Sequence, residues 1–173
     1  MGAPETLPMF PLGTVLFPSM LLPLRVFEPR YREMMQICLD GNQRFGVVMI
    51  ERGSEVGGGD VRSSVGCSAT IVQAQESADG QWALLALGTK RIRVREWLVD
   101  DPFPRAVVEP WCDDAPDVEL ADKLTTVTPS FRTALALAAG HDEWSVPLTM
   151  ELDADPEVAL FQMCAASPLG PHD

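Results

Sequence analysis

The side chains that could bind a metal ion are few in this chain, and their spacing argues against such a site. Four cysteines, Cys38, Cys67, Cys112 and Cys164, lie much farther apart than the roughly two to four residues that separate zinc ligands in a knuckle. Neither of the two histidines is near a cysteine in the sequence. We therefore expect no metal site, and four reduced thiols packed mostly as small hydrophobic side chains in a cytoplasmic protein.

The residues needed for nucleotide binding and for hydrolysis are missing as well. Neither lysine, Lys90 or Lys123, stands in the glycine loop of a Walker A motif, and the glycines at 57–59 lack the strand–turn–helix context of a dinucleotide site. His141 lies in an acidic loop sequence without a Gly-x-Ser-x-Gly elbow, and His172 is the penultimate residue. We expect no catalytic residue and no cofactor, and interpret His141 as a solvated side chain.

Three alternating arginines are the one candidate for an anion-binding stripe. Arg91, Arg93 and Arg95 project from the same face of a strand. They could bind an acidic ligand or RNA, or they could form an exposed face paired with neighbouring carboxylates. We favour the second interpretation because the first 112 residues carry 11 Lys and Arg against 13 Asp and Glu. The candidate partners are Glu76, Glu96 and Glu109.

A single carboxylate, Glu28, ends a very apolar stretch and has Arg25 and Arg30 close by. A partly buried carboxylate needs a charged or backbone partner. It could anchor a ligand, or it could hold the end of a strand to the start of the next helix. We favour the structural role.

The composition places these residues in a folded protein of one or two small domains. Apolar residues make up 46% of the chain and charged residues 22%, with a mean hydropathy of +0.05, which excludes intrinsic disorder. No apolar run approaches the ~18 residues of a membrane helix, and the N-terminus has no basic region before an apolar stretch. We expect neither membrane insertion nor a secretory signal.

Prolines and turn residues predict a β-rich first part with one helix. The prolines at 8, 11, 18 and 23 exclude a continuous helix and leave extended pieces at about 7–10, 14–17 and 21–27. Pro29 then begins a helix to Asp40 whose buried face is Tyr31, Met34, Met35 and Cys38. Further strands are predicted at 45–51, 65–75 with a bulge at Gly66, 82–87, 91–98 and 106–111, with a hairpin turn at 78–80.

The charge and the periodicity both change near residue 112. Residues 113–173 carry 2 Lys and Arg against 12 Asp and Glu, a field that repels nucleic acid. A helical pattern covers about 118–127, Thr128-Pro129 predicts a new helix to about 139, and Asp155-Pro156 predicts another. We therefore predict a β-rich domain at 1–113 and an acidic helical domain at 114–173.

Several segments resemble the N-terminal domain family of Lon proteases. They are LPMFPLG at 7–13, LFP at 16–18 and LPLRVFEPRY at 22–31, followed by similar pieces at 45–48, 65–71 and 88–94. The block around residues 22–31 is the specific part, with Pro23, Phe27, Glu28, Arg30 and Tyr31 as its structural residues. The resemblance is strong over about 6–112 and weak over the tail.

The resemblance implies an α+β fold, in which a PUA-like β-barrel or orthogonal sheet with one inserted helix is followed by a small helical subdomain. It also implies a part that engages protein substrates, as in Lon, and a relation to the Lon-like domain of cereblon. The ATPase and Ser-Lys protease elements of Lon are absent from these residues.

We therefore expect a non-enzymatic module that binds exposed apolar peptide segments or a protein partner. Five methionines after the first residue suit adaptable binding, although we expect three of them to fill the core: Met9, Met20, Met34, Met35 and Met49. An RNA-binding PUA-like module and an ATP-dependent peptidase named by family are the two alternatives. The first would need a concentrated basic patch, which the net charge of -12 disfavours.

A groove between the barrel and the acidic tail is the predicted binding site. The proline-broken segment cannot be fully paired in a sheet, so some of its apolar side chains should line that groove. An acidic rim would then favour apolar segments that carry Lys or Arg. The predicted peptide-binding residues are Phe10, Phe17, Met20, Leu22, Met34 and Met35.

Overall fold

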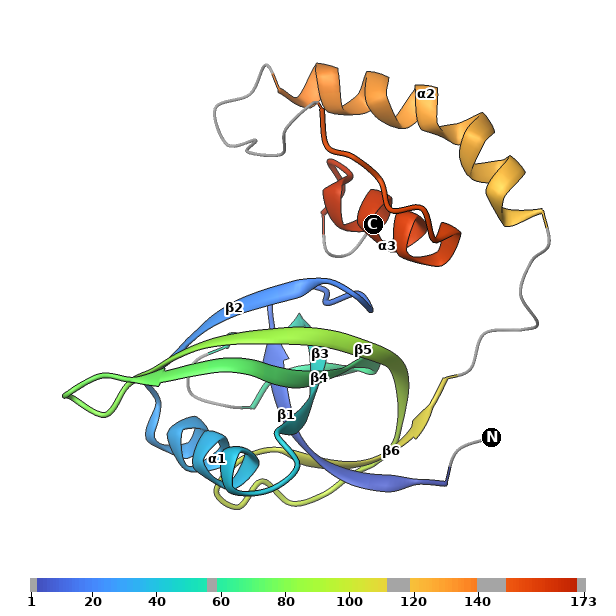
Figure 1. The fold of residues 1–173 in the computed structure, drawn as a ribbon. Helices are drawn as coiled ribbons and strands as arrows, with labels where there is room; N and C mark the ends of the chain where they lie inside the picture. The colour runs from blue at the N-terminus through green and yellow to red at the C-terminus, as the bar shows by residue number, and fades with distance from the viewer. Residues whose placement is uncertain (1–2, 56–58, 112–118, 140–148, 171–173) are drawn as a thin grey trace. The chain divides into compact units, whose positions relative to one another are not determined.

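The computed structural model describes residues 3–55, 59–111, 119–139 and 149–170 (Figure 1). The chain divides into two compact units, Met1–Cys112 and Asp113–Asp173. The first unit holds all six strands and one helix, and the described residues of the second form two helices. The chain is therefore an α+β protein, as the sequence predicted.

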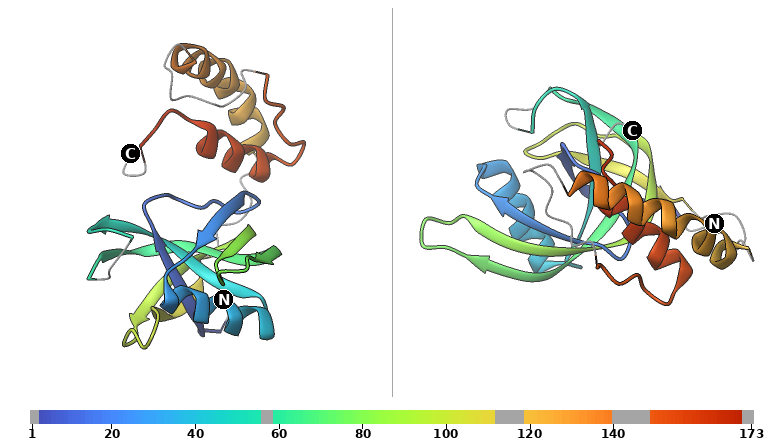
Figure 2. Two further views of the ribbon diagram at one scale, coloured as in Figure 1. Left: turned by 90° about the vertical axis from the view of Figure 1, so that its left-hand side faces the viewer. Right: turned by 90° about the horizontal axis from the view of Figure 1, so that it is seen from above.

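A six-stranded sheet closed on itself forms the first unit. The elements run β1 (Glu5–Leu12), β2 (Leu21–Val26), α1 (Pro29–Asp40), β3 (Arg44–Arg52), β4 (Val61–Glu76), β5 (Trp82–Trp97) and β6 (Arg105–Pro110). The strand order is β2-β5-β4-β3-β1-β6, and β6 also pairs with β5, which closes five of the strands into a barrel. All pairings are antiparallel except that of β1 with β3. In the side view of Figure 2 the barrel strands cross one another steeply.

Strand β5 is continuous where the sequence predicted two strands, at 82–87 and 91–98. Its first half pairs with β2 and its second half with β6, while β4 follows it along most of its length. The residues at 88–90 stay in the ladder with β4, and the register shifts by one residue there. Gly88 was expected in a connection between two strands, but it lies at a bend within β5. A register shift at such a point increases the local curvature of the strand.

The segment between β1 and β2 crosses over this bend and is not the strand predicted at 14–17. The Ser19 amide donates to the Gly88 carbonyl at 2.8 Å, and the Gly88 amide donates to the Met20 carbonyl at 2.9 Å. A side chain at Gly88 would place its Cβ 2.2 Å from the Phe17 carbonyl oxygen. Glycine is therefore required for the close approach. Gly66 has the same function in β4, where the Val47 carbonyl lies 2.2 Å from its ideal Cβ position, and the predicted bulge is absent from Gly66 itself.

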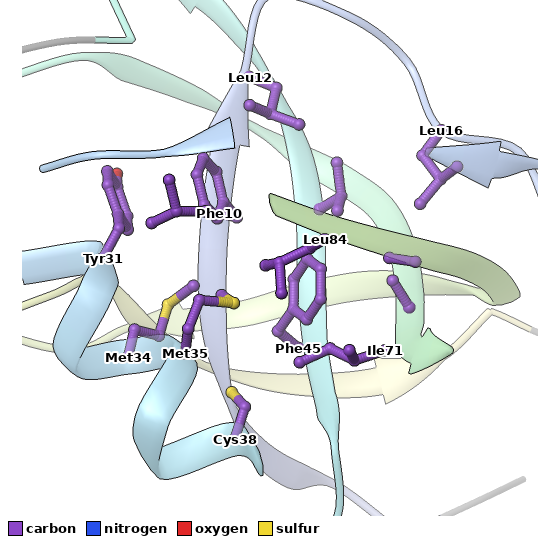
Figure 3. Packing of buried hydrophobic residues seen from close by; sticks show 14 of the residues in the cluster. Phe10, Leu12, Leu16, Tyr31, Met34, Met35, Cys38, Phe45, Ile71 and Leu84 are labelled. Atoms are coloured by element: carbon purple, nitrogen blue, oxygen red, sulfur yellow. The ribbon is translucent and has the colours of Figure 1, made fainter. Parts of the chain in front are cut away.

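Helix α1 covers the main core, and its prediction is confirmed at both ends. Pro29 occupies the first turn, and the buried side chains are Tyr31, Met34, Met35 and Cys38. Figure 3 shows these side chains directed at Phe10 and Phe45 from β1 and β3. The rings of Phe10 and Tyr31 are stacked with centroids 4.3 Å apart.

A second buried cluster makes β1 and β3 apolar on both faces. Leu7 and Met9 of β1 pack with Val48 of β3 in this cluster, whereas Phe10 and Leu12 belong to the main core. A parallel strand pair buried on both faces reads as a continuous apolar run, which is the pattern of PMFPL in this sequence.

The second unit is a helical pair. Helix α2 (Leu120–Ala138) is continuous, so the predicted new helix at Thr128-Pro129 is wrong. Pro129 removes one helix hydrogen bond, and the helix nevertheless continues past it. Packing of Phe131 and Leu135 on α3 (Pro156–Ala166) holds the helix together. Asp155 caps α3, as predicted, by accepting from the amides of residues 157 and 158.

A partly buried ion-pair cluster joins β4 to the loops that precede β4 and follow β5. Arg62 Nε lies 2.6 Å from Asp60 Oδ2, and its Nη2 lies 2.6 Å from Asp100 Oδ2. The guanidinium also stacks on Trp97, 4.8 Å from the ring centroid. Burial alone would raise the pKa of Asp60, but the hydrogen bonds and charge of Arg62 outweigh it and lower the pKa below its ordinary value.

We predict that Gly88→Ala lowers the free energy of unfolding by about 1–3 kcal/mol, because the new methyl group would displace the Phe17 carbonyl. Urea denaturation measures this change. Gly13→Ala is the matched control, since the atom nearest its ideal Cβ is the mobile end of Glu55, 3.2 Å away. Equal stabilities of the two variants would contradict the crossing.

We predict that stability falls with acidification more steeply in the wild type than in Asp60→Asn. The lowered pKa of Asp60 means that its ion pair contributes fully above the unfolded-state pKa of about 3.9. This contribution is lost as the pH decreases from about 4 through the folded-state pKa. Unfolding free energies from pH 7 to 2.5 measure the difference, and parallel curves would refute the assignment.

Candidate functional site

An apolar groove lies where the β1–β2 segment crosses the barrel. It has a volume of about 260 Å³ and is bounded by the crossing segment, β3, β4 and β5. We call it the loop groove. Its apolar lining is Val15, Leu16, Phe17, Pro18, Val47, Val48, Met49 and Val65.

The loop groove is partly open to solvent because some of the side chains that line it are exposed. Val15 is 41% exposed and Phe17, Met49 and Val65 are half-buried, so these four are the accessible apolar side chains of the groove. The other apolar lining residues are buried: Leu16, Pro18, Val47 and Val48. Residues 13–20 are not part of a strand, and Pro18 among them has no amide hydrogen to donate; the segment is tied to β5 through the hydrogen bonds that Ser19 and Met20 make with Gly88. Ser63 and Gly66 complete the lining, and Arg91 is the only charged residue among the described residues that line it.

The six predicted peptide-binding residues separate into three groups. Phe17 lines the loop groove. Met20 and Leu22 are half-buried and pack against the main core. Phe10, Met34 and Met35 are at most 7% exposed and belong to the main core, and none of them lines the loop groove; Phe10 borders the smaller hollow described below.

The burial of these three residues has a simple physical reason. Phe10 of β1 and the buried side chains of α1 belong to one cluster, in which each covers the other's apolar surface. Three of the five early methionines, Met9, Met34 and Met35, are fully buried, as the sequence predicted. Their contacts are therefore already made within the chain.

A second, smaller hollow of about 170 Å³ is lined by four of the five structural residues predicted in the block at 22–31. Pro23, Phe27, Glu28 and Tyr31 all border it, and Phe27 is 54% exposed. Arg30 lies behind it, with Nη2 3.2 Å from Glu28 Oε2 and its guanidinium 4.6 Å from the Tyr31 ring centroid. Burial raises the pKa of Tyr31 to about 12, so its hydroxyl stays protonated. This arrangement suits the structural role predicted for Glu28.

The arginine stripe of β5 is divided between two kinds of contact. Arg95 Nε lies 2.7 Å from Glu109 Oε2, one of the predicted carboxylate partners. The guanidinium groups of Arg91 and Arg93 instead stack on Trp111, 5.2 and 4.3 Å from the ring centroid. The stripe is therefore not a uniform basic surface.

Metal and membrane sites find no support in the part of the chain that the structure describes. No group of three His, Cys, Asp or Glu side chains that could hold a metal occurs among the described residues. None of the described helices is both long and apolar enough to cross a membrane. Cys112, His141 and His172 lie outside the described residues.

The side of the groove that β3, β4 and β5 form was not predicted from the sequence. Val65 and Arg91 come from β4 and β5, far from the proline-broken segment in the chain. The sequence marks Met49 as one of the adaptable methionines but not as part of this groove. Alternation along β3 and β4 gave a signal for which side chains share a face, but not for which face the crossing segment covers.

Comparison with known proteins gives a family match over most of the chain. Residues 6–173 match the family of the ATP-dependent protease La (LON) substrate-binding domain. The Lon protease of Dictyoglomus thermophilum is 35% identical over 107 residues, covering 61% of this chain and 14% of that protein. A Schizosaccharomyces pombe LON peptidase N-terminal domain and RING finger protein is 29% identical over 115 residues, covering 60% of this chain and 24% of that protein.

Two solved structures share the fold. A Lon N-terminal domain protein from Xanthomonas campestris has a TM-score of 0.55 and 28% identity, covering 95% of this chain and 99% of that one. The N-terminal domain of a Mycobacterium avium complex Lon protease has a TM-score of 0.55 at 14% identity, covering 94% of this chain and 97% of that one, and supports the fold alone.

We predict that Met20→Ser with Leu22→Ser lowers the free energy of unfolding by roughly 2 kcal/mol, because both side chains pack half-buried on the main core. Phe17→Ser, in the groove wall, should lower it less. Thermal or urea unfolding distinguishes the two variants. An unchanged melting temperature in the double variant would contradict a core role for Met20 and Leu22 and would favour their predicted role in binding.

Proposed function

The chain belongs to the family of Lon substrate-binding domains, and we propose that it binds exposed apolar segments of other proteins without catalysing a reaction. The observation that carries this proposal is the loop groove, a partly open apolar surface on the barrel. Phe17 is the predicted binding residue that we keep in this site, together with Val15, Met49 and Val65. We propose that Phe10, Met34 and Met35 support binding only through the core.

Apolar side chains in an open groove favour binding of segments that are themselves apolar. Each side chain that leaves water on binding contributes about 25 cal/mol per Å² of apolar area. Contacts of this kind depend on shape and area more than on a particular side chain, which suits recognition of many unfolded sequences. Met49 adds an adaptable side chain to the wall.

A binding role without catalysis is supported by the family description, which names a substrate-binding domain. The chain spans 14% of the length of the first Lon protease that it matches, so peptidase activity is not carried over from that relative. We also propose a cytoplasmic location, because Cys38 and Cys67 are free thiols, as is usual for proteins of a reducing compartment.

Binding to a reduced and alkylated model protein should be detectable with the purified chain, and Phe17→Ser with Val65→Ser should weaken it about tenfold or more. The loss follows from removing two apolar contacts of the groove. Fluorescence anisotropy with a labelled unfolded protein measures the dissociation constant.

The matched control is Val99→Ser, because Val99 is 81% exposed and does not line the groove. This variant should bind as the wild type does. An absence of binding at high micromolar concentration would contradict the proposed function, and peptide hydrolysis by the purified chain in the presence of ATP would contradict its non-catalytic part.

A further inference from the structure

The side chains that point into the barrel can be followed from strand to strand, because residues opposite each other in a ladder face the same side of the sheet. Met9 of β1 lies opposite Gly46 of β3, and Gly46 lies opposite Ser68 of β4. Ser68 in turn lies opposite Lys90 of β5. Met9 belongs to the second buried cluster, whose buried members come from β1, β3, β5 and β6 and fill the barrel. Ser68 and Lys90 therefore point inward as well.

The inward positions become polar at one end of the barrel. Two residues beyond Gly46 and Ser68, Arg44 of β3 lies opposite Thr70 of β4. A hollow of about 340 Å³ opens there, and we call it the barrel mouth. It is lined by Glu5, Arg44, Ser68, Thr70, Thr89, Lys90, Ile92 and Pro110. It shares no lining residue with the loop groove, and barrel mouths are a common place for small-molecule sites.

The carboxylate of the barrel mouth already has a partner. Arg44 Nη2 donates to Glu5 Oε1 at 2.8 Å, and Arg44 Nη1 donates to Glu5 Oε2 at 3.1 Å. This two-bond pair neutralises both charges and occupies both carboxylate oxygens. Glu5 is the only acidic side chain among the described residues that line the mouth, so Lys90 gives the described lining a net positive charge.

The polar groups that remain are hydrogen-bond donors. Ser68 is 1% exposed, and its Oγ accepts from Arg44 Nη2 at 3.3 Å. In the described part of the chain no side chain or carbonyl accepts the Ser68 hydroxyl proton, and none pairs with the Thr70 hydroxyl or the Lys90 ammonium. A buried donor without an acceptor is costly, so these groups favour a ligand that only accepts.

We propose that the barrel mouth binds the phosphate group of a small phosphomonoester, with Ser68, Thr70 and Lys90 donating to its terminal oxygens. This site is separate from the loop groove, and its ligand goes beyond the proposed binding of apolar segments. A phosphate monoester has three terminal oxygens that act as acceptors, which matches the three donors. The alcohol part of the ester then lies toward Pro110, which is half-buried in the lining.

Two other anionic ligands match the mouth less well. A carboxylate has two oxygens for the same donors and carries less charge toward Lys90. Single-stranded RNA requires cations along the whole path of its backbone, whereas the described lining has one cation outside the Glu5–Arg44 pair. The volume of the mouth is that of a small-molecule site.

Calorimetric titration of the full chain at constant ionic strength tests the ligand class with glycerol phosphate, inorganic phosphate and glycerate. We expect glycerol phosphate to bind about tenfold tighter than glycerate, the gain typical of additional charge-assisted hydrogen bonds. Weaker binding of inorganic phosphate than of the ester supports contacts to the alcohol part. Inorganic phosphate that binds as tightly as the ester would overturn those contacts, and glycerate that binds as tightly would overturn the phosphate site.

Three variants test the residues. Lys90→Gln should weaken glycerol phosphate binding about tenfold, and Ser68→Ala about fivefold. Glu5→Gln should instead strengthen binding, because it removes a negative charge and loosens the pair that holds the Arg44 donors. A merely structural role of the pair would not give this opposite sign. Lys123→Gln is the matched control, since it makes the same charge change in the second unit and should leave the affinity unchanged.

Unchanged affinity in both Lys90→Gln and Glu5→Gln would overturn the inference, as would an absence of glycerol phosphate binding to the wild type. Lys90 is exposed, so this test stands even if Ser68→Ala does not fold. Competition by single-stranded RNA that is lost in Lys90→Gln would make the mouth a nucleic-acid site and would also overturn the inference. Binding of the unfolded model protein should be the same in Lys90→Gln and the wild type, so failure of the phosphate site leaves the proposed function intact.

Discussion

The fold depends on the close approach of two backbones at Gly88. Strand β5 must pair with β2 on its first half and with β6 on its second, which requires a bend, and the β1–β2 segment must cross at that bend. Both are possible because no Cβ stands between the strand and the Phe17 carbonyl. The closure of the barrel and the position of β2 therefore both depend on one residue without a side chain.

The loop groove is a consequence of this crossing. The crossing segment is not a strand, although Ser19 and Met20 hydrogen-bond to Gly88 of β5, and it buries the side chains that point toward the core while leaving others accessible at its edges. Leu16 enters the main core, while Val15 and Phe17 remain accessible beside β3 and β4. The crossing thus creates an apolar surface that the core does not use. Proline alone does not explain it, because Pro8, Pro11 and Pro23 lie within paired strands and only Pro18 lies in the crossing segment.

Charge is distributed differently in the two units, and this affects how each can meet a partner. The first unit carries nearly balanced charges, so local arrangement decides its electrostatics. Arg62 is enclosed by Asp60 and Asp100 and serves the fold, whereas Arg91 borders the groove. The second unit has a large negative excess, and the field of such an excess acts over a longer range than a single ion pair.

The sequence by itself determined the fold class, helix α1 with its four buried residues, the start of α3, and the family. These follow from local rules, since proline, capping residues and apolar spacing act within a few residues of the chain. The tertiary structure decided that Gly88 lies within one strand, that Pro129 lies within one helix, and that Phe10, Met34 and Met35 fill the core while Phe17 lines the groove. Local patterns mark a side chain as apolar, but burial depends on which distant segment covers it. Arg91 meets the groove only because strand pairing brings β5 beside β4, a contact between residues more than twenty apart in the chain.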